Sequence, residues 1–273
     1  MTRLAAGDTV GGWKLARKLG RGGTGTVYEA SHESRPGRFA VKVLALDDRA
    51  VPEGRGMFER ERHLLAAVAH PNVVRLVDSG TVDTSSYLVM ELVEGETLRA
   101  RLARGRLTGR ALARAGTELC SALAAIHAAG ILHRDLTPSN LMLRDDALIV
   151  LDFGLARVVG DATVTASRGI RMSLAYAPPE RYQGEPQTIA SDVYQAGLVL
   201  FEMATGRRVF PDEDPSRLAT AHLLERVPSA RALVPDLPPL IERLFDRALR
   251  KKPGERYADA RALLEDWSFL LPS

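Results

Sequence analysis

The chain has 273 residues, of which 45% are hydrophobic and 26% are charged, a composition that is typical of a folded globular protein and excludes a disordered one. This length can bury a large core and suits one large domain or two lobes. The formal net charge of +3 is small, and basic residues are interspersed with acidic ones, so we expect no nucleic-acid partner.

Membrane and secretory signals are missing from the sequence as given. No uninterrupted run of about 18 apolar residues is present, so we expect no membrane segment in this chain, and its first residues lack the apolar core of a signal peptide. The single cysteine, Cys120, excludes an internal disulfide, suits a reducing cytosol and is expected to be buried. We therefore expect a cytoplasmic location, either for a free-standing protein or for the cytosolic domain of a longer, membrane-anchored one.

The first predicted element is a hairpin from Trp13 to Ala30 with a glycine-rich turn. Gly20, Gly22 and Gly25 follow a GxGxxG spacing, which lets backbone N–H groups approach phosphate oxygens without obstruction by a Cβ atom. This spacing alone is weak evidence, because dinucleotide-binding folds share it, but there the glycines lead into a helix. Here residues 26–28 continue as a strand, which favours a flap-like hairpin.

The next predicted strand, residues 38–44, carries Lys42. Of the 37 basic residues in the chain only five are lysines, and Lys42 is the only lysine between Lys18 and Lys251. A compact ammonium group at one internal position, in a chain that otherwise uses arginine, indicates a point charge with a specific partner.

A helix is then predicted from Met57 to Ala69, followed by strands at Val73–Asp78 and Tyr87–Leu92. From Glu96 onward the spacing of apolar residues becomes typical of helices. The predicted helices are Leu98–Leu102 and Thr108–Ala129, with closing helices within Pro235–Leu271.

The stretch from Ile131 to Gly154 carries the chemistry. Asp135 and Asn140 lie five residues apart in a loop, and the apolar runs that follow predict a hairpin that brings Asp152 beside this loop. A carboxylate together with an amide suits Mg²⁺, which takes oxygen ligands and usually shares its coordination shell with substrate phosphates. Asp135 then remains to orient a hydroxyl nucleophile.

The sequence HRDLTPSN followed by DFG resembles the catalytic and metal loops of the eukaryotic-type, or Hanks-type, serine/threonine protein kinases. The resemblance covers residues 13–270. It implies a bilobal α+β fold, with a small antiparallel β lobe with one helix (residues 1–90), a hinge (91–95) and a larger, mainly helical lobe (96–273). The composition, rich in alanine and arginine, indicates the bacterial branch.

This resemblance implies transfer of the γ-phosphoryl group of ATP to serine or threonine hydroxyls of protein substrates, with Mg²⁺, or alternatively Mn²⁺, as the metal. Asp135 would position the hydroxyl and accept its proton, and Lys42 would pair with Glu61. Glu59 is the other glutamate in the predicted helix and is assigned to the solvated surface. The remaining implied catalytic residues are Asn140, Thr137 and Ser173, and the implied metal ligands are Asn140 and Asp152.

The implied nucleotide site surrounds both the base and the phosphates. Met90 would lie at its back, and the backbone of the hinge would hold the adenine. Its residues are Leu19, Gly20, Gly22, Gly25, Val27, Ala40, Lys42, Met90, Glu91, Val93, Met142 and Asp152.

Twenty-two residues separate Gly154 from Ala177, and they resemble an activation loop. The resemblance implies autophosphorylation there, with Arg134 and Arg157 as a basic pocket for the phosphate. A homodimer would allow one copy to modify another. The candidate phosphosites are Thr163, Thr165 and Ser167.

Later motifs imply structural roles. His133 is expected to pack inside and bond to backbone rather than to act as an acid or base. Residues 191–197 resemble the start of the central helix of the larger lobe, and Asp192 in this helix is expected to fix the backbone around His133. Glu180 is expected to form a buried bridge with Arg256. A second alternative is a small-molecule kinase. Small-molecule phosphotransferases with similar loops generally lack these motifs, so their presence argues against this alternative.

One departure bears on activity. Serine/threonine kinases carry a lysine two residues after the catalytic aspartate, and this chain has Thr137 there. Its hydroxyl is able to bond Asp135, Ser173 or the substrate but supplies no cation, and losing one such charge costs about 10²–10³ in rate if nothing replaces it. The alternative is therefore a pseudokinase, an ATP-binding or protein-binding scaffold with weak or no activity.

Overall fold

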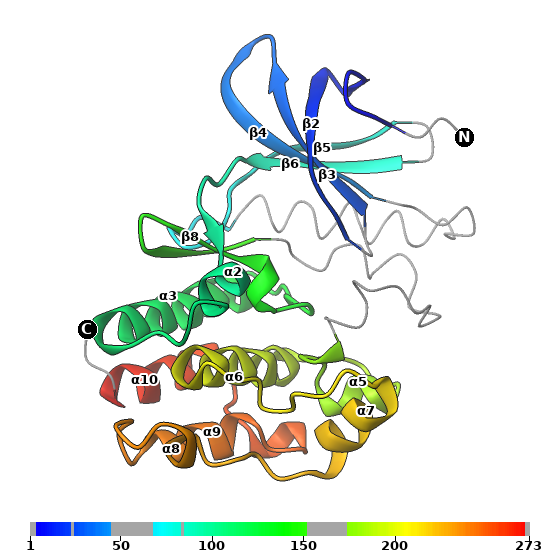
Figure 1. Ribbon diagram of the computed structural model, residues 1–273. Coiled ribbons are helices and arrows are strands. Elements are labelled where there is room, and N and C mark those ends of the chain that lie inside the picture. The colour runs from blue at the N-terminus through cyan, green and yellow to red at the C-terminus, as the bar shows by residue number, and fades with distance from the viewer. Residues whose placement is uncertain (1–3, 23–24, 45–67, 83–84, 152–173, 271–273) are drawn as a thin grey trace.

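The computed structural model describes residues 4–22, 25–44, 68–82, 85–151 and 174–270. The N-terminal residues among these form a β-sheet, and the C-terminal ones form a mainly helical part that lies below the sheet in Figure 1. Among the described residues, no helix is both long and apolar enough to cross a bilayer.

The N-terminal sheet has six strands in the described residues, in the order β1-β2-β3-β4-β6-β5, and every pairing is antiparallel. The predicted hairpin and the strand that carries Lys42 are confirmed. The strands are β1 (Thr9–Val10), β2 (Trp13–Gly22), β3 (Gly25–His32), β4 (Arg35–Leu44), β5 (Leu76–Val82) and β6 (Ser85–Glu91).

The bounds of β5 differ from the prediction, which placed this strand at Val73–Asp78. Val73 instead forms an isolated parallel bridge with Val150, outside this sheet. The strand continues through a polar stretch to Val82 because antiparallel pairing with β6 holds it there, up to the pair Val82 and Ser85. The predicted helix Met57–Ala69 lies mostly outside the described residues.

A buried tryptophan organises the core of this sheet. Trp13 is fully buried, its indole N–H donates to Asp78 Oδ2 at 2.9 Å, and its ring meets the Phe39 ring edge-on at a centroid distance of 4.8 Å. Because a buried indole N–H needs a partner, the bond to Asp78 fixes the orientation of the ring. The strands β2, β4 and β5 are thereby tied together.

The second part contains a small sheet, β7-β8-β9, and the helices. The strands are β7 (Glu96–Thr97), β8 (Leu141–Arg144) and β9 (Ala147–Val150). The helices are α2 (Leu98–Leu102), α3 (Gly109–Ala128), α5 (Pro179–Tyr182), α6 (Ile189–Thr205), α7 (Pro215–Leu224), α8 (Ala230–Leu233), α9 (Ile241–Ala248) and α10 (Ala260–Leu270), with the 3-10 turns η1 (Pro138–Asn140) and η3 (Pro253–Glu255). The predicted α2, α3 and hairpin are confirmed.

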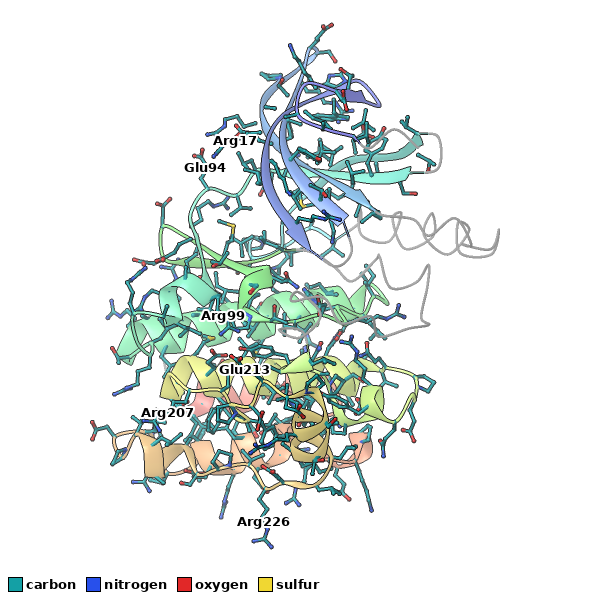
Figure 2. The ribbon with its side chains drawn as sticks, turned by 45° about the vertical axis from the view of Figure 1, so that its right-hand side comes forward. Arg17, Glu94, Arg99, Arg207, Glu213 and Arg226 are labelled. Carbon is teal, nitrogen blue, oxygen red and sulfur yellow. The ribbon has the colours of Figure 1, made fainter. Side chains whose placement is uncertain are left out.

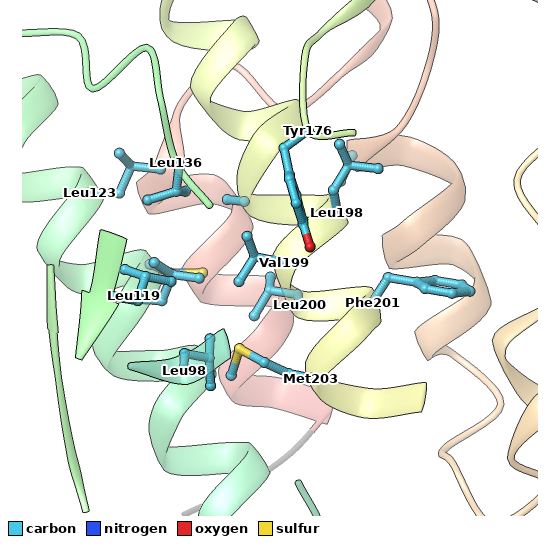
Figure 3. Close-up of a cluster of buried hydrophobic side chains, with 14 of the residues drawn as sticks. Leu98, Leu119, Leu123, Leu136, Tyr176, Leu198, Val199, Leu200, Phe201 and Met203 are labelled. Atoms are coloured by element: carbon cyan, nitrogen blue, oxygen red, sulfur yellow. The ribbon is translucent and has the colours of Figure 1, made fainter. Parts of the chain in front are cut away.

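Helix α6 is the axis of the helical core. It is buried on every side from Ser191 to Thr205, which is typical of a helix enclosed by other elements. A capping box formed by Thr188 and Ser191 starts it, and Gly206, in the left-handed conformation with φ 73°, ends it. Figure 3 shows its apolar side chains between those of α3 and the neighbouring helices.

Gly116 provides a test of this packing, because helix α3 lies against α10 there. A Cβ atom at Gly116 would lie 2.1 Å from Cε2 of the buried Trp267. We predict that Gly116→Ala lowers the free energy of unfolding by about 1–3 kcal/mol through overpacking. Urea denaturation measures this change. Gly254→Ala is the control, since a Cβ atom there meets nothing within 4 Å; equal stabilities for the two variants would contradict the prediction.

Candidate active site

The loop that contains Asp135 is fixed by one carboxylate of helix α6. Asp192 is fully buried and accepts hydrogen bonds from the backbone N–H groups of His133 at 2.7 Å and Arg134 at 2.8 Å. The imidazole of His127, from α3, lies 3.0 Å from the same carboxylate. The predicted role of Asp192 is confirmed, and these donors compensate for burying its charge.

The same bonds hold a strained backbone. Arg134 has φ 64°, in the left-handed region, which costs a non-glycine residue roughly 1–2 kcal/mol. His133 is fully buried, and its Nε2 lies 3.2 Å from the carbonyl oxygen of Leu151. The prediction that His133 packs inside and bonds to backbone is therefore confirmed.

Asp135 and Asn140 lie together, as their spacing predicts. The Asn140 amide donates to the Asp135 backbone carbonyl at 2.7 Å and to Asp135 Oδ2 at 3.3 Å. The turn η1 makes this possible, because it returns the chain after Thr137, whose side chain is buried. The Asn140 carbonyl accepts from the N–H of Leu151 at 2.9 Å, so the chain that leads into Asp152 begins beside the loop.

Lys42 occupies the middle of the N-terminal sheet. It lies on β4 opposite Val27 of β3 and Leu88 of β6, and the residue is only 3% exposed. Ala40 lies two residues earlier and therefore on the same face of the strand, opposite Met90. A buried ammonium group requires negative partners, which is the property expected of a residue that binds phosphate.

The other predicted nucleotide residues take varied positions. Leu19 is 39% exposed on β2, Val93 is buried just beyond β6, and Val27, Met90 and Met142 are partly buried. Gly20 pairs with Val27, and Gly22 pairs with Gly25, across the hairpin of β2 and β3. The predicted residues outside the described ranges are Glu59, Glu61, Asp152, Arg157, Thr163, Thr165, Ser167 and Ser173.

The predicted bridge between Glu180 and Arg256 is confirmed. Two parallel bonds of 2.9 Å join the guanidinium group to the carboxylate, and both side chains are almost fully buried. Burial alone would raise the pKa of Glu180, but hydrogen bonds from Arg256 and Ser191 outweigh it, so the pKa of this carboxyl lies below its ordinary value. Cys120 is also buried as predicted, and burial raises the pKa of its thiol to about 12.

Two polar features of this region were not predicted from the sequence. Arg99 of α2, labelled in Figure 2, lies in the helical part of the chain. It donates to Glu202 of α6 at 2.9 Å and to the hydroxyl group of Tyr176, which itself donates to Glu202. The second is Gln195, which is fully buried and contacts the loop around Asp135. The sequence offered one signal for this role: Gln195 comes three residues after Asp192, so the two side chains lie on the same face of the helix.

A sheet that carries a buried lysine, together with a helical part that presents Asp135 and Asn140 on a fixed loop, defines the class of protein. It is a bilobal protein kinase fold.

Comparisons with known proteins agree. Residues 13–268 match the family described as the protein kinase domain. Serine/threonine-protein kinase PknH of Mycobacterium tuberculosis is 35% identical over 256 residues, covering 93% of this chain and 41% of that protein. Serine/threonine-protein kinase PrkC of Bacillus subtilis is 34% identical over 258 residues, covering 94% of this chain and 40% of PrkC. The chain thus spans about two fifths of the length of these relatives.

The crystal structure of the M. tuberculosis PknI kinase domain has a TM-score of 0.79 with this chain at 27% identity, covering 98% of this chain and 99% of that one. The chain belongs to the protein kinase family. The predicted family and fold are therefore confirmed, and its similarity to bacterial serine/threonine kinases agrees with the predicted branch.

The buried ion pair of Glu180 and Arg256 gives a prediction about stability. We expect Arg256→Met to lower the free energy of unfolding by about 3–5 kcal/mol, because it leaves the Glu180 carboxylate buried without its partner. The double variant with Glu180→Leu should recover part of the loss. Urea denaturation measures both, and Lys252→Met, which breaks an exposed pair with Glu255, should cost less than about 1 kcal/mol. A small loss for Arg256→Met would contradict the assigned role.

Proposed function

We propose that this chain is the catalytic domain of a serine/threonine protein kinase, which transfers the γ-phosphoryl group of ATP to hydroxyl groups of protein substrates. The observation that carries the proposal is the pairing of Asp135 with Asn140 on a loop held from inside by Asp192. Phosphoryl transfer depends mainly on positioning and electrostatic stabilisation, which such a rigid loop supports.

In this proposal Asp135 orients the substrate hydroxyl and accepts its proton late in the transfer. Lys42 and the glycine turn of β2 and β3 hold the phosphates, and Glu61 holds Lys42. The hinge, residues 91–95, binds the adenine through its backbone between lobes 1–90 and 96–273. Leu19, Val27, Ala40 and Met142 enclose the base, and Met90 closes the back of the site.

The side-chain oxygen atoms near Asp135 suit a divalent metal ion. The Asn140 amide nitrogen is engaged by Asp135, which leaves its oxygen as the group that can hold a cation. We propose that Asn140 and Asp152 hold Mg²⁺, because it prefers such oxygen ligands. When bound, the metal would neutralise charge on the phosphates.

The proposal extends to regulation and location. Thr163, Thr165 and Ser167 are the proposed autophosphorylation sites, modified within a homodimer, and Ser173 is proposed to contact the catalytic loop. We place the domain in the cytosol, where ATP and protein substrates are available.

The central test compares label transfer from radioactive ATP. We expect Asp135→Asn to lower phosphorylation of the protein itself and of a basic protein substrate by at least about 10², because the hydroxyl is no longer oriented and its proton has no acceptor. Asp146→Asn, the same chemical change at an exposed turn between β8 and β9, should leave transfer unchanged. Label that persists equally in Asp135→Asn would exclude the assigned mechanism.

A second candidate function is a pseudokinase, and Thr137 is the observation that favours it. Its side chain is buried and adds no positive charge beside Asp135. Absence of label in the wild type as well as in Asp135→Asn, with nucleotide binding retained, would support this candidate.

Replacing Thr137 tests whether the site lacks only a charge. We expect Thr137→Lys to raise the rate of transfer by about tenfold or more, because a preorganised cation near the transferring group typically contributes about 10²–10³. Steady-state kinetics measure kcat, and Thr137→Met controls for side-chain size. A neutral or harmful effect of lysine would indicate that another group already supplies the charge.

A further inference from the structure

Gln195 of helix α6 makes hydrogen bonds to the backbone on both sides of Asp135. Its Oε1 accepts from the N–H of Leu136 at 3.3 Å, and its Nε2 lies 3.4 Å from the carbonyl oxygen of Arg134. The peptide groups before and after Asp135 are therefore held by one side chain, which is fully buried.

The same amide reaches a second segment. Its Nε2 donates to the carbonyl oxygen of Tyr176 at 3.1 Å, in the stretch that leads into α5. Figure 3 shows the side chains of Leu136 and Tyr176 beside α6, on elements that come from different parts of the chain. Gln195 thus connects the loop of Asp135 with residues 174–177.

Only a primary amide of this length meets these requirements. It combines an acceptor, used by the Leu136 N–H, with two N–H donors, which face two carbonyl oxygens. The opposite orientation of the amide would place its oxygen against both carbonyls, so the partners fix the assignment. Glutamate would lose the donors, methionine would lose all three contacts, and asparagine is one methylene shorter.

The contacts of Gln195 complement those of Asp192 one turn earlier on α6. Asp192 holds the N–H groups of His133 and Arg134, whereas Gln195 holds the carbonyl of Arg134 and the N–H of Leu136. Arg134 lies between them in the left-handed conformation. Asn140 also holds the peptide group after Asp135, through its carbonyl oxygen, so Gln195 adds a bond to the N–H of that peptide group and holds the carbonyl of the peptide group before Asp135.

We propose that Gln195 is a positioning residue, which sets the orientation of the Asp135 carboxylate and couples it to the backbone of residues 174–177. This inference rests on the proposed phosphoryl transfer, and it adds a residue that acts through Asp135 without touching the substrate. Loss of the amide should therefore reduce kcat and leave KM for ATP nearly unchanged, because the contacts of Gln195 are with the backbone of Arg134, Leu136 and Tyr176, none of which is a proposed nucleotide-binding residue.

The test compares Gln195→Met, which keeps the side-chain length, with Gln195→Glu and with a control. Thr205→Val is the matched control, because it removes buried hydrogen bonds to the carbonyls of Phe201 and Arg207 at the far end of the same helix. Hydrogen exchange read by mass spectrometry is measured on peptides that contain Leu136 and residues 174–177. Kinetics with ATP and a peptide substrate give kcat and KM.

We expect Gln195→Met to speed exchange in both segments by about tenfold and to lower kcat by a similar factor, with KM for ATP within about twofold, since a lost buried hydrogen bond typically has an effect of this order. Gln195→Glu should speed exchange at residues 174–177 more than at Leu136, because it keeps only the acceptor. Thr205→Val should change neither segment nor kcat.

Exchange that is unchanged in either segment, or a kcat equal to that of the wild type, would overturn the inference. Wild-type protein without phosphoryl transfer would contradict the proposed function instead. Exchange in the variants would still decide whether Gln195 couples the two segments.

Discussion

The buried carboxylate of Asp192 is the constraint on which the arrangement of the active site depends. A charge removed from water must be compensated, and the protein supplies donors from α3 and from two consecutive backbone N–H groups of the loop. Satisfying this one group commits the loop, α3 and α6 to a single arrangement. The energy gained offsets the left-handed conformation of Arg134, so the strain beside Asp135 is maintained by the interior of the helical part.

The polar groups inside the helical part extend this principle. Arg256 and Glu180 fix the start of α5 against η3, and Arg99, Tyr176 and Glu202 fix the segment before α5 against α2 and α6. Each of these contacts joins elements that are far apart in the sequence. The apolar core gives the helices their stability, whereas the buried polar contacts determine the register in which the loops leave them.

Much of this fold was predictable from the sequence, because local patterns determine it. The glycine turn, the strand of Lys42, the long helix α3 and the hairpin of β8 and β9 follow from periodicity and turn residues, whereas helix α6 was expected from the resemblance to the kinase family. The far end of β5 was not predictable, because pairing with β6 and not its own polar residues makes it a strand. Gln195 was missed for a related reason: its role depends on three backbone groups that only the folded chain brings together. The site assignments for Lys42, Asp135, Asn140 and Asp152 remain predictions drawn from the family.

The stretch before β5 connects the N-terminal sheet to the helical part in a second way. The first connection is the chain itself, which crosses between β6 and β7. The second is a pair of hydrogen bonds: the N–H of Val74 donates to the carbonyl oxygen of Val150 at 2.9 Å, and the side-chain amide of Asn72 donates to the carbonyl oxygen of Leu148 at 2.8 Å. The apolar core is continuous at this place as well, since Leu44, Val73 and Leu88 pack in one cluster with Leu141 and Val150. A movement of the sheet relative to the helical part would therefore either keep these hydrogen bonds and pivot near them, or break them.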